Sequence, residues 1–219
     1  MKIPPVRLTP LAMVLIAGVL LLAFFVQFGL ISVAFDRFGL TEKSALLLAV
    51  ISFLGSIINL PLLQVSGNSP LPPATAAGQF PVADYHGTTL ITVNVGGCLV
   101  PVAFCLYLLD HVSIDALRVL TVMTAVAAVS YRFSYSIPGA GIAIPTLLPP
   151  VTAAVLAALI DQKHAAPTAY VAGTLGVLIG ADLLRLSSVR LLRVPVVSIG
   201  GAGTFDGVFL AGLLAALLA

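Results

Sequence analysis

The sequence predicts an all-α fold: a polytopic helical membrane protein with about seven transmembrane helices, broken helices and a proline-rich loop. Of its 219 residues, 60% are hydrophobic and only 8% are charged, and the mean hydropathy is +1.16. A soluble domain usually carries about 25% charged residues. The polar side chains are therefore too few to cover a water-facing surface, and the long apolar runs are typical of membrane helices.

Seven apolar segments are expected to form the helices of a single integral membrane domain over residues 1–219. The expected ranges are 8–33, 44–60, 91–109, 114–129, 146–160, 168–186 and 198–218. The first run holds 28 uncharged residues from Leu8 to Phe35. It is longer than the apolar core of a signal peptide, which has roughly 7–15 residues, and this favours a retained first helix.

Capping residues and prolines define the second helix and the loop after it. Thr41 and Ser44 supply an N-cap, and Pro61 is expected to end the helix because proline disfavours the α conformation in the residue before it. Residues 61–87 contain five prolines, which exclude a regular helix. Strand-like stretches at 60–65 and 88–95 flank this loop and predict a short hairpin, or a partly inserted loop, at one membrane face.

Two further stretches interrupt the helical pattern. Residues 94–97, Asn-Val-Gly-Gly, lie near the start of the third helix and are expected to break or kink it. Residues 131–145 contain two prolines and cannot be helical throughout. The fifth helix tolerates Pro149 and Pro150 because both fall in its first turn. Irregular backbone at membrane depth must be buried in protein or line a wet cavity. If the protein is a transporter, the breaks at 94–97 and 138–145 would form its binding site.

Asp182 and Asp206, one on each of the last two expected helices, are the candidate catalytic residues. A charged side chain at the centre of a bilayer costs about 2.5–3.5 kcal/mol on insertion scales, so its presence needs a reason. Two neighbouring carboxylates can share one proton, with one activating water while the other acts as an acid. This predicts hydrolysis of membrane-embedded peptide bonds. A membrane aspartate that alternates between charged and neutral would equally suit a small-solute or proton-coupled transporter or channel.

Four further residues are predicted to contribute to substrate binding or to close packing. Gly180 precedes Asp182, and Gly203 and Gly207 flank Asp206. Small residues let another backbone approach closely. Asn94 is expected to form hydrogen bonds between helices.

Structural roles for both aspartates compete with the catalytic hypothesis. Asp206 follows a glycine-rich stretch and would be stabilised in the first turn of a helix by the helix dipole. Asp182 precedes Arg185 by three residues, a spacing that permits an ion pair on one helix face. A membrane scaffold without chemistry is therefore a third hypothesis.

The sequence predicts no metal, cofactor or nucleic-acid partner. It has no Walker-type, dinucleotide-binding or zinc-protease motif, and its ten basic residues are scattered rather than grouped with aromatic residues. Cys98 and Cys105 are seven residues apart on one expected helix, about 10 Å along its axis, which is too far for a disulfide. The expected partners are membrane lipid and transmembrane peptide substrates.

Four motifs together resemble the DUF1614 family, a group of prokaryotic membrane proteins. They are Asn94-Val-Gly-Gly, Gly141-Ile-Ala-Ile-Pro, the run from Gly173 to Leu184 that contains Asp182, and Ser198-Ile-Gly-Gly-Ala-Gly-Thr-Phe-Asp206-Gly207. The resemblance covers residues 59–219 and implies a membrane protein without supplying an activity.

The paired aspartates also resemble those of the GxGD intramembrane aspartyl proteases, which place one aspartate on each of two helices. The local sequences depart from that family. Ile-Gly-Ala-Asp182 and Gly-Thr-Phe-Asp206 are not Gly-x-Gly-Asp, and no Pro-Ala-Leu motif follows. The resemblance implies a chemistry rather than membership.

The distribution of basic residues predicts the orientation in the membrane. With the N-terminus inside, inner segments carry six Lys and Arg residues and outer segments carry four. Because cytoplasmic loops carry the excess of positive charge, the chain is expected in the prokaryotic cytoplasmic (inner) membrane with a cytoplasmic N-terminus.

Overall fold

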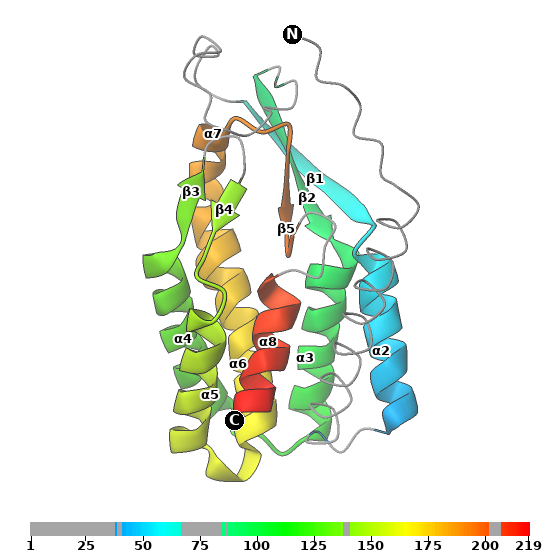
Figure 1. Cartoon of the computed structure of the whole chain (residues 1–219), viewed down its shortest axis with the longest axis vertical. Coiled ribbons are helices and arrows are strands. Elements are labelled where there is room, and N and C mark those ends of the chain that lie inside the picture. The colour runs from blue at the N-terminus through cyan, green and yellow to red at the C-terminus, as the bar shows by residue number, and fades with distance from the viewer. Residues whose placement is uncertain (1–37, 39–40, 67–84, 86, 138–140, 202–206) are drawn as a thin grey trace, which may run out of the picture.

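The computed structural model describes residues 38, 41–66, 85, 87–137, 141–201 and 207–219. These residues are mostly helical, and two small β-sheets lie at one end of the helical bundle (Figure 1). The prediction of an all-α fold is corrected by these sheets. The first expected helix, 8–33, lies outside the described residues.

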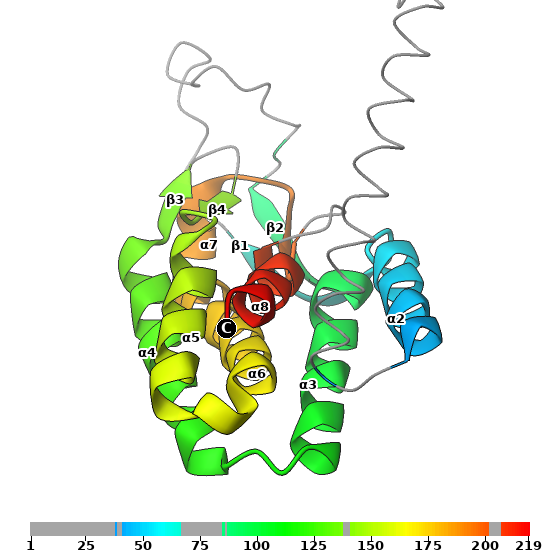
Figure 2. The same ribbon diagram turned by 60° about the horizontal axis from the view of Figure 1, so that its bottom comes forward.

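The bundle is built around α6, which is enclosed by neighbouring helices (Figure 2). Eleven of its 13 residues are buried, and α3, α4, α5 and α8 pack against it. The helices are α2 (Glu42–Gly55), α3 (Val100–His111), α4 (Ala116–Phe133), α5 (Leu148–Ile160), α6 (Ala165–Val177), α7 (Val189–Leu192) and α8 (Gly207–Leu218).

Short helical turns continue or precede three of these helices. The π-helical turn η2 (Val95–Leu99) leads into α3, and a second π-helical turn, η4 (Leu178–Asp182), extends α6. The 3-10 turns η3 (Gln162–His164) and η5 (Leu183–Ser188) precede α6 and α7. The predicted helix 168–186 is therefore an α-helix only as far as Val177.

The larger sheet has the strand order β1-β2-β5. Its strands are β1 (Asn59–Ser66), β2 (Thr88–Asn94) and β5 (Val196–Ile199). The β1–β2 pair is antiparallel, which confirms the predicted hairpin, and β5 pairs with β2 in parallel. The helices predicted to start at residues 91 and 198 begin later. Both positions lie in short stretches rich in β-branched residues, which form β2 and β5 instead.

The second sheet is a small hairpin of β3 (Tyr135–Ile137) and β4 (Gly141–Ala143). It confirms that residues 131–145 are not helical throughout, although α4 runs to Phe133 rather than to the predicted 129. The predicted N-cap is confirmed, since the Thr41 hydroxyl accepts a hydrogen bond from the Ser44 amide at 3.3 Å. The second helix ends at Gly55, five residues before the predicted end, because the next residues enter β1.

Among the described residues, α4 is the one helix long and apolar enough to cross a membrane, with a mean hydropathy of 1.3. The helices α2, α3 and α5 are apolar but shorter. One helix of this length and composition is by itself weak evidence for a membrane protein.

The Asp161 carboxylate ties α4, α5 and α6 together at the end of the bundle away from the sheets. It accepts hydrogen bonds from Arg118 Nη1 at 3.0 Å and from Thr168 Oγ1 at 2.8 Å, and His164 Nδ1 lies 3.7 Å away. Burial alone raises the pKa of Asp161, but the hydrogen bonds from Thr168 and Arg118 and the charge of Arg118 outweigh it. The pKa therefore lies below its usual value of 3.8.

We expect Asp161→Asn to lower the free energy of unfolding by about 1.5–3 kcal/mol at neutral pH, the usual contribution of hydrogen bonds to a charged group. Because the pKa of Asp161 is lower in the folded state than in the unfolded state, its stabilisation is complete above about pH 4 and is lost as the pH falls through the folded-state pKa. Thermal unfolding in detergent at pH 7 and under progressively acidic conditions measures both effects.

The exposed Asp110→Asn is the matched control and should change the free energy of unfolding by less than about 0.5 kcal/mol. The acid limb of the Asp161→Asn profile should be flatter than that of wild type. Parallel profiles for the two proteins would show that Asp161 does not carry the acid sensitivity.

Candidate functional site

Asp182 is the last residue of η4, where the central helix leaves regular α geometry. Its side chain is half-buried, and Asp182 Oδ2 accepts a hydrogen bond from the backbone amide of Gly200 at 2.9 Å. The helix is held close to α4 at this level: a β-carbon on Gly180 would collide with the Ala127 carbonyl oxygen and would lie 2.7 Å from Ser130 Cβ. Gly180 therefore serves close packing, and Asp182 is anchored to the turn that follows β5.

The turn after β5 requires glycine. Gly200 and Gly201 have φ values of +77° and +95°, a conformation that residues with a side chain rarely adopt. Gly200 also approaches η2: a β-carbon there would lie 2.6 Å from Cys98 Cβ and 2.7 Å from the Gly97 carbonyl carbon. A β-carbon on Gly97 would in turn collide with the Gly200 carbonyl oxygen. Two Gly-Gly turns, one after each parallel strand, therefore pack backbone against backbone beside Asp182.

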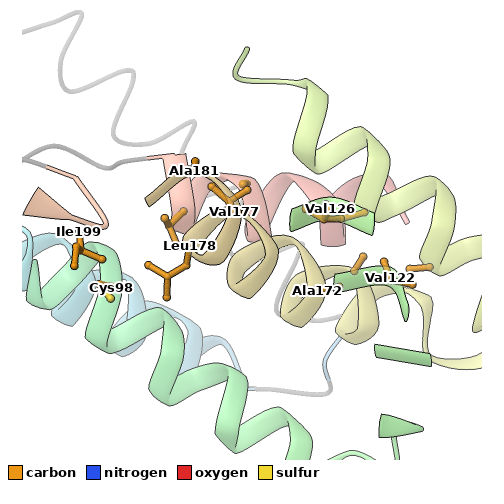
Figure 3. Packing of buried hydrophobic residues seen from close by; sticks show 14 of the residues in the cluster. Cys98, Val122, Val126, Ala172, Val177, Leu178, Ala181 and Ile199 are labelled. Atoms are coloured by element: carbon orange, nitrogen blue, oxygen red, sulfur yellow. The ribbon is translucent and has the colours of Figure 1, made fainter. Parts of the chain in front are cut away.

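The residues packed beneath Asp182 and the two Gly-Gly turns are apolar. Cys98 and Ile199 lie side by side with Leu178 next to them, and Val177 and Ala181 continue the surface along the central helix (Figure 3). All five residues are buried and belong to one hydrophobic cluster. Low local polarity strengthens electrostatic interactions, so a carboxylate at this edge has more influence on a bound group than it would have in water.

Asn94 holds the strands and helices of this region in register. It is 1% exposed, and its side-chain amide donates to the Ser56 carbonyl at 2.7 Å and to Asn59 Oδ1 at 3.1 Å. Its oxygen accepts from the Gly97 amide at 2.7 Å, which caps η2. The structure therefore places Asn94 as a buried support of the η2 turn.

Arg185 contacts α4. Its Nε donates to Ser134 Oγ at 3.0 Å, its Nη2 donates to the Tyr131 and Ser134 carbonyls at 2.6 and 2.7 Å, and its guanidinium lies 4.4 Å from the centre of the Tyr131 ring. These bonds satisfy carbonyls that a helix C-terminus leaves without partners. The competing hypothesis expected Arg185 to form an ion pair with Asp182. In the structure the Arg185 guanidinium instead donates hydrogen bonds to the C-terminus of α4.

The packing of α8 on α6 indicates where α8 begins relative to Asp182. A β-carbon on Gly173 would lie 3.2 Å from Ala215 Cβ and 3.4 Å from the Ala211 carbonyl oxygen, and one on Gly212 would collide with Thr174 Oγ1. The two helices run in opposite directions, because α6 leads toward the sheets whereas α8 leads away from them to the C-terminus (Figure 1). Extending this register places Gly207, the first residue of α8, within about one helical turn of Asp182 along the bundle axis.

Asp206 and Gly203 lie outside the described residues, and Gly207 is described as the first residue of α8. The structure thus brings together Asp182, Gly180, Asn94 and the start of α8 at one end of the bundle. Residues 97 and 200 were missed as site residues. The signal that could have found them is the repeated Gly-Gly after two strand-forming runs.

The family profile described as "Protein of unknown function (DUF1614)" matches residues 53–218. No curated protein and no solved structure matches the chain.

Proposed function

Because the chain belongs to the DUF1614 family, whose description assigns no activity, we propose a function from the site itself: a membrane-embedded aspartyl peptide hydrolase that uses Asp182 and Asp206. The observation that carries the proposal is the hydrogen bond between Asp182 and Gly200. It fixes one carboxylate to the turn after β5, and in the sequence the other carboxylate, Asp206, follows this turn and immediately precedes α8.

The distribution of exposed side chains supports placement in a membrane. Large apolar side chains are exposed on the outer faces of α2, α3, α4 and α5: Leu47, Phe53, Leu54, Leu106, Leu109, Leu117, Leu120, Val151, Val155 and Leu159. Polar side chains such as Ser52, Ser130, Thr168 and Thr174 are buried instead. Water penalises exposed apolar surface on this scale, whereas lipid accommodates it.

The proposed reaction needs one ionised and one protonated carboxylate. The ionised group takes a proton from water while the water oxygen attacks the peptide carbonyl carbon, and the protonated group donates its proton to the carbonyl oxygen. The proton taken from water then passes to the leaving nitrogen as the C–N bond breaks. One hydroxyl of the tetrahedral diol returns its proton to the carboxylate that donated it, which restores one ionised and one protonated group. Water is consumed, and a carboxylate and an amine are released, so no cofactor is needed.

The sheet supplies a way to hold the substrate. Among the described residues β5 is an edge strand, paired on one side with β2, and it ends at the Gly200 turn. An extended peptide that adds to such an edge gains backbone hydrogen bonds without a sequence requirement. A substrate aligned with β5 would place a peptide bond beyond Ile199, near Asp182.

The test is cleavage of single-span reporter peptides by the purified full chain in liposomes. Wild type should release a fragment cut within the span, and Asp182→Asn and Asp206→Asn should each lower the rate of its release by about 10²–10⁴-fold. Asp110→Asn, which changes an exposed aspartate, should cleave like wild type. Equal cleavage by all proteins, or none by wild type, would overturn the proposal. Flux of a solute or proton in the same liposomes, lost in the aspartate variants without any cleavage, would establish the transporter instead.

A further inference from the structure

The two ends of the bundle differ in charge. Near the sheets the described residues include four arginines, Arg132, Arg185, Arg190 and Arg193, and one carboxylate, Asp182. The opposite end, where α2 begins and α3 ends (Figure 1), carries three Lys and Arg residues and four acidic residues. All ion pairs among the described residues lie at that opposite end. Among the described residues, the arginines near the sheets therefore outnumber the carboxylates there by four to one.

Three of these arginines form no ion pair with any described carboxylate. Arg132 and Arg190 are exposed, and Arg193 is half-exposed. They lie in one neighbourhood, because Arg185 joins η5 to the C-terminus of α4 and because α7 packs against β3. Arg193 has φ = 54°, a left-handed conformation that favours glycine over arginine. Arg193 is the C-cap of α7, a position where helices commonly end in this conformation.

Exposed aromatic rings accompany the charges. Tyr131, Phe133 and Tyr135 are 45%, 49% and 56% exposed, and the Arg132 guanidinium lies 5.7 Å from the centre of the Phe133 ring. Aromatic rings concentrate at the boundary between lipid tails and headgroups, and arginines just outside that boundary attract anionic headgroups. Tyr131 and Phe133 lie in the last turn of α4, the helix with the length of a membrane span, and Tyr135 begins β3 just after it.

We propose that Arg132, Arg190 and Arg193, together with the aromatic residues around the C-terminus of α4, form a binding surface for the headgroups of anionic phospholipids. The inference rests on the membrane placement in the proposed function and does not require hydrolysis. It orients the chain with the Asp182 end toward the membrane face that is rich in anionic lipid. A specific headgroup surface there would keep the candidate site at a fixed depth.

The test measures which lipids the purified full chain retains from micelles that contain equal amounts of phosphatidylglycerol and phosphatidylcholine, by native mass spectrometry. Wild type should retain phosphatidylglycerol preferentially. The double variant Arg132→Gln/Arg190→Gln should lose about 30-fold of that preference, since each arginine near a membrane surface contributes about fivefold. Arg193→Gly should lose about fivefold without loss of folding, because glycine suits the left-handed conformation.

Lys43→Gln/Lys163→Gln is the matched control, because it removes two exposed cations from the opposite end. It should keep the preference of wild type. If both double variants lose the preference for phosphatidylglycerol equally, the preference depends only on net charge and the proposal is overturned. Displacement of the lipid by excess inorganic phosphate would also overturn it. A chain that selects phosphatidylglycerol but cleaves no reporter would leave this inference standing while the proposed hydrolysis fails.

Discussion

Replacing Asp182 with asparagine should lower the rate of reporter cleavage by about 10²–10⁴-fold, the range that general acid–base groups contribute. The amide retains an oxygen that can accept the hydrogen bond from the Gly200 amide, now 2.9 Å from Asp182 Oδ2. The turn after β5 should therefore stay in place. What is lost is the ability of the side chain to take up or release a proton. The measurement is the initial rate of fragment release in liposomes, with thermal unfolding recorded on the same preparations.

A second substitution at this position separates chemistry from geometry. Asp182→Glu keeps the carboxylate and moves it by about one methylene, and a displacement near 1 Å costs on the order of 10²-fold in an enzyme. Glutamate should therefore retain more activity than asparagine. If asparagine and glutamate both leave the rate unchanged, Asp182 has no part in the reaction, whatever its hydrogen bond to Gly200 does for the fold.

The hairpin, the Thr41 cap and the bounds of α5 could be predicted because each depends on residues close together in the sequence. Beta-branched content predicts β2, a threonine predicts the start of α2, and two prolines predict the first turn of α5. Such signals act over a few residues. They do not report which strands pair, so the parallel pairing of β2 with β5 was missed, although it brings together residues about a hundred positions apart.

The strand β2 and the helix α3 that follows it show why some of the predicted helix boundaries were wrong. Residues 91–109 form one long apolar run, and a short buried strand cannot be distinguished from a buried helix segment by hydrophobic periodicity. The same ambiguity placed the start of the last helix at residue 198, inside β5. In both cases a Gly-Gly pair marks the true change from strand to helix, and it is the contact between these two pairs that builds the site.

For the candidate site, the sequence predicted Asp182 and the close packing of Gly180 but not the surroundings of either residue. Arg185 illustrates the reason. Its spacing from Asp182 predicts an ion pair only on a continuous α-helix. The chain instead passes through the η4 and η5 turns, and the C-terminus of α4 offers carbonyls without partners. Unsatisfied backbone groups on a distant helix are not visible in local sequence.

Gly97→Ala should slow cleavage strongly and destabilise the fold by about 1–3 kcal/mol or more, the usual cost of adding volume to a packed interior. The added β-carbon would collide with the Gly200 carbonyl oxygen, which belongs to the backbone and cannot move like a side chain. The two Gly-Gly turns would have to separate. The Gly200 amide would then be displaced from Asp182, and cleavage should fall by at least about 10²-fold.

Gly173→Ala is the matched control. It makes the same change in α6, away from the two Gly-Gly turns. The new β-carbon would meet Ala215 Cβ at 3.2 Å and the Ala211 carbonyl oxygen at 3.4 Å, contacts that need only a small adjustment. Alanine also favours the helix by roughly 0.5–1 kcal/mol. Its free energy of unfolding should therefore stay within about 1 kcal/mol of wild type, with activity retained. If Gly97→Ala behaves like this control in thermal unfolding and in reporter cleavage, the close approach of the two turns is not what positions Asp182.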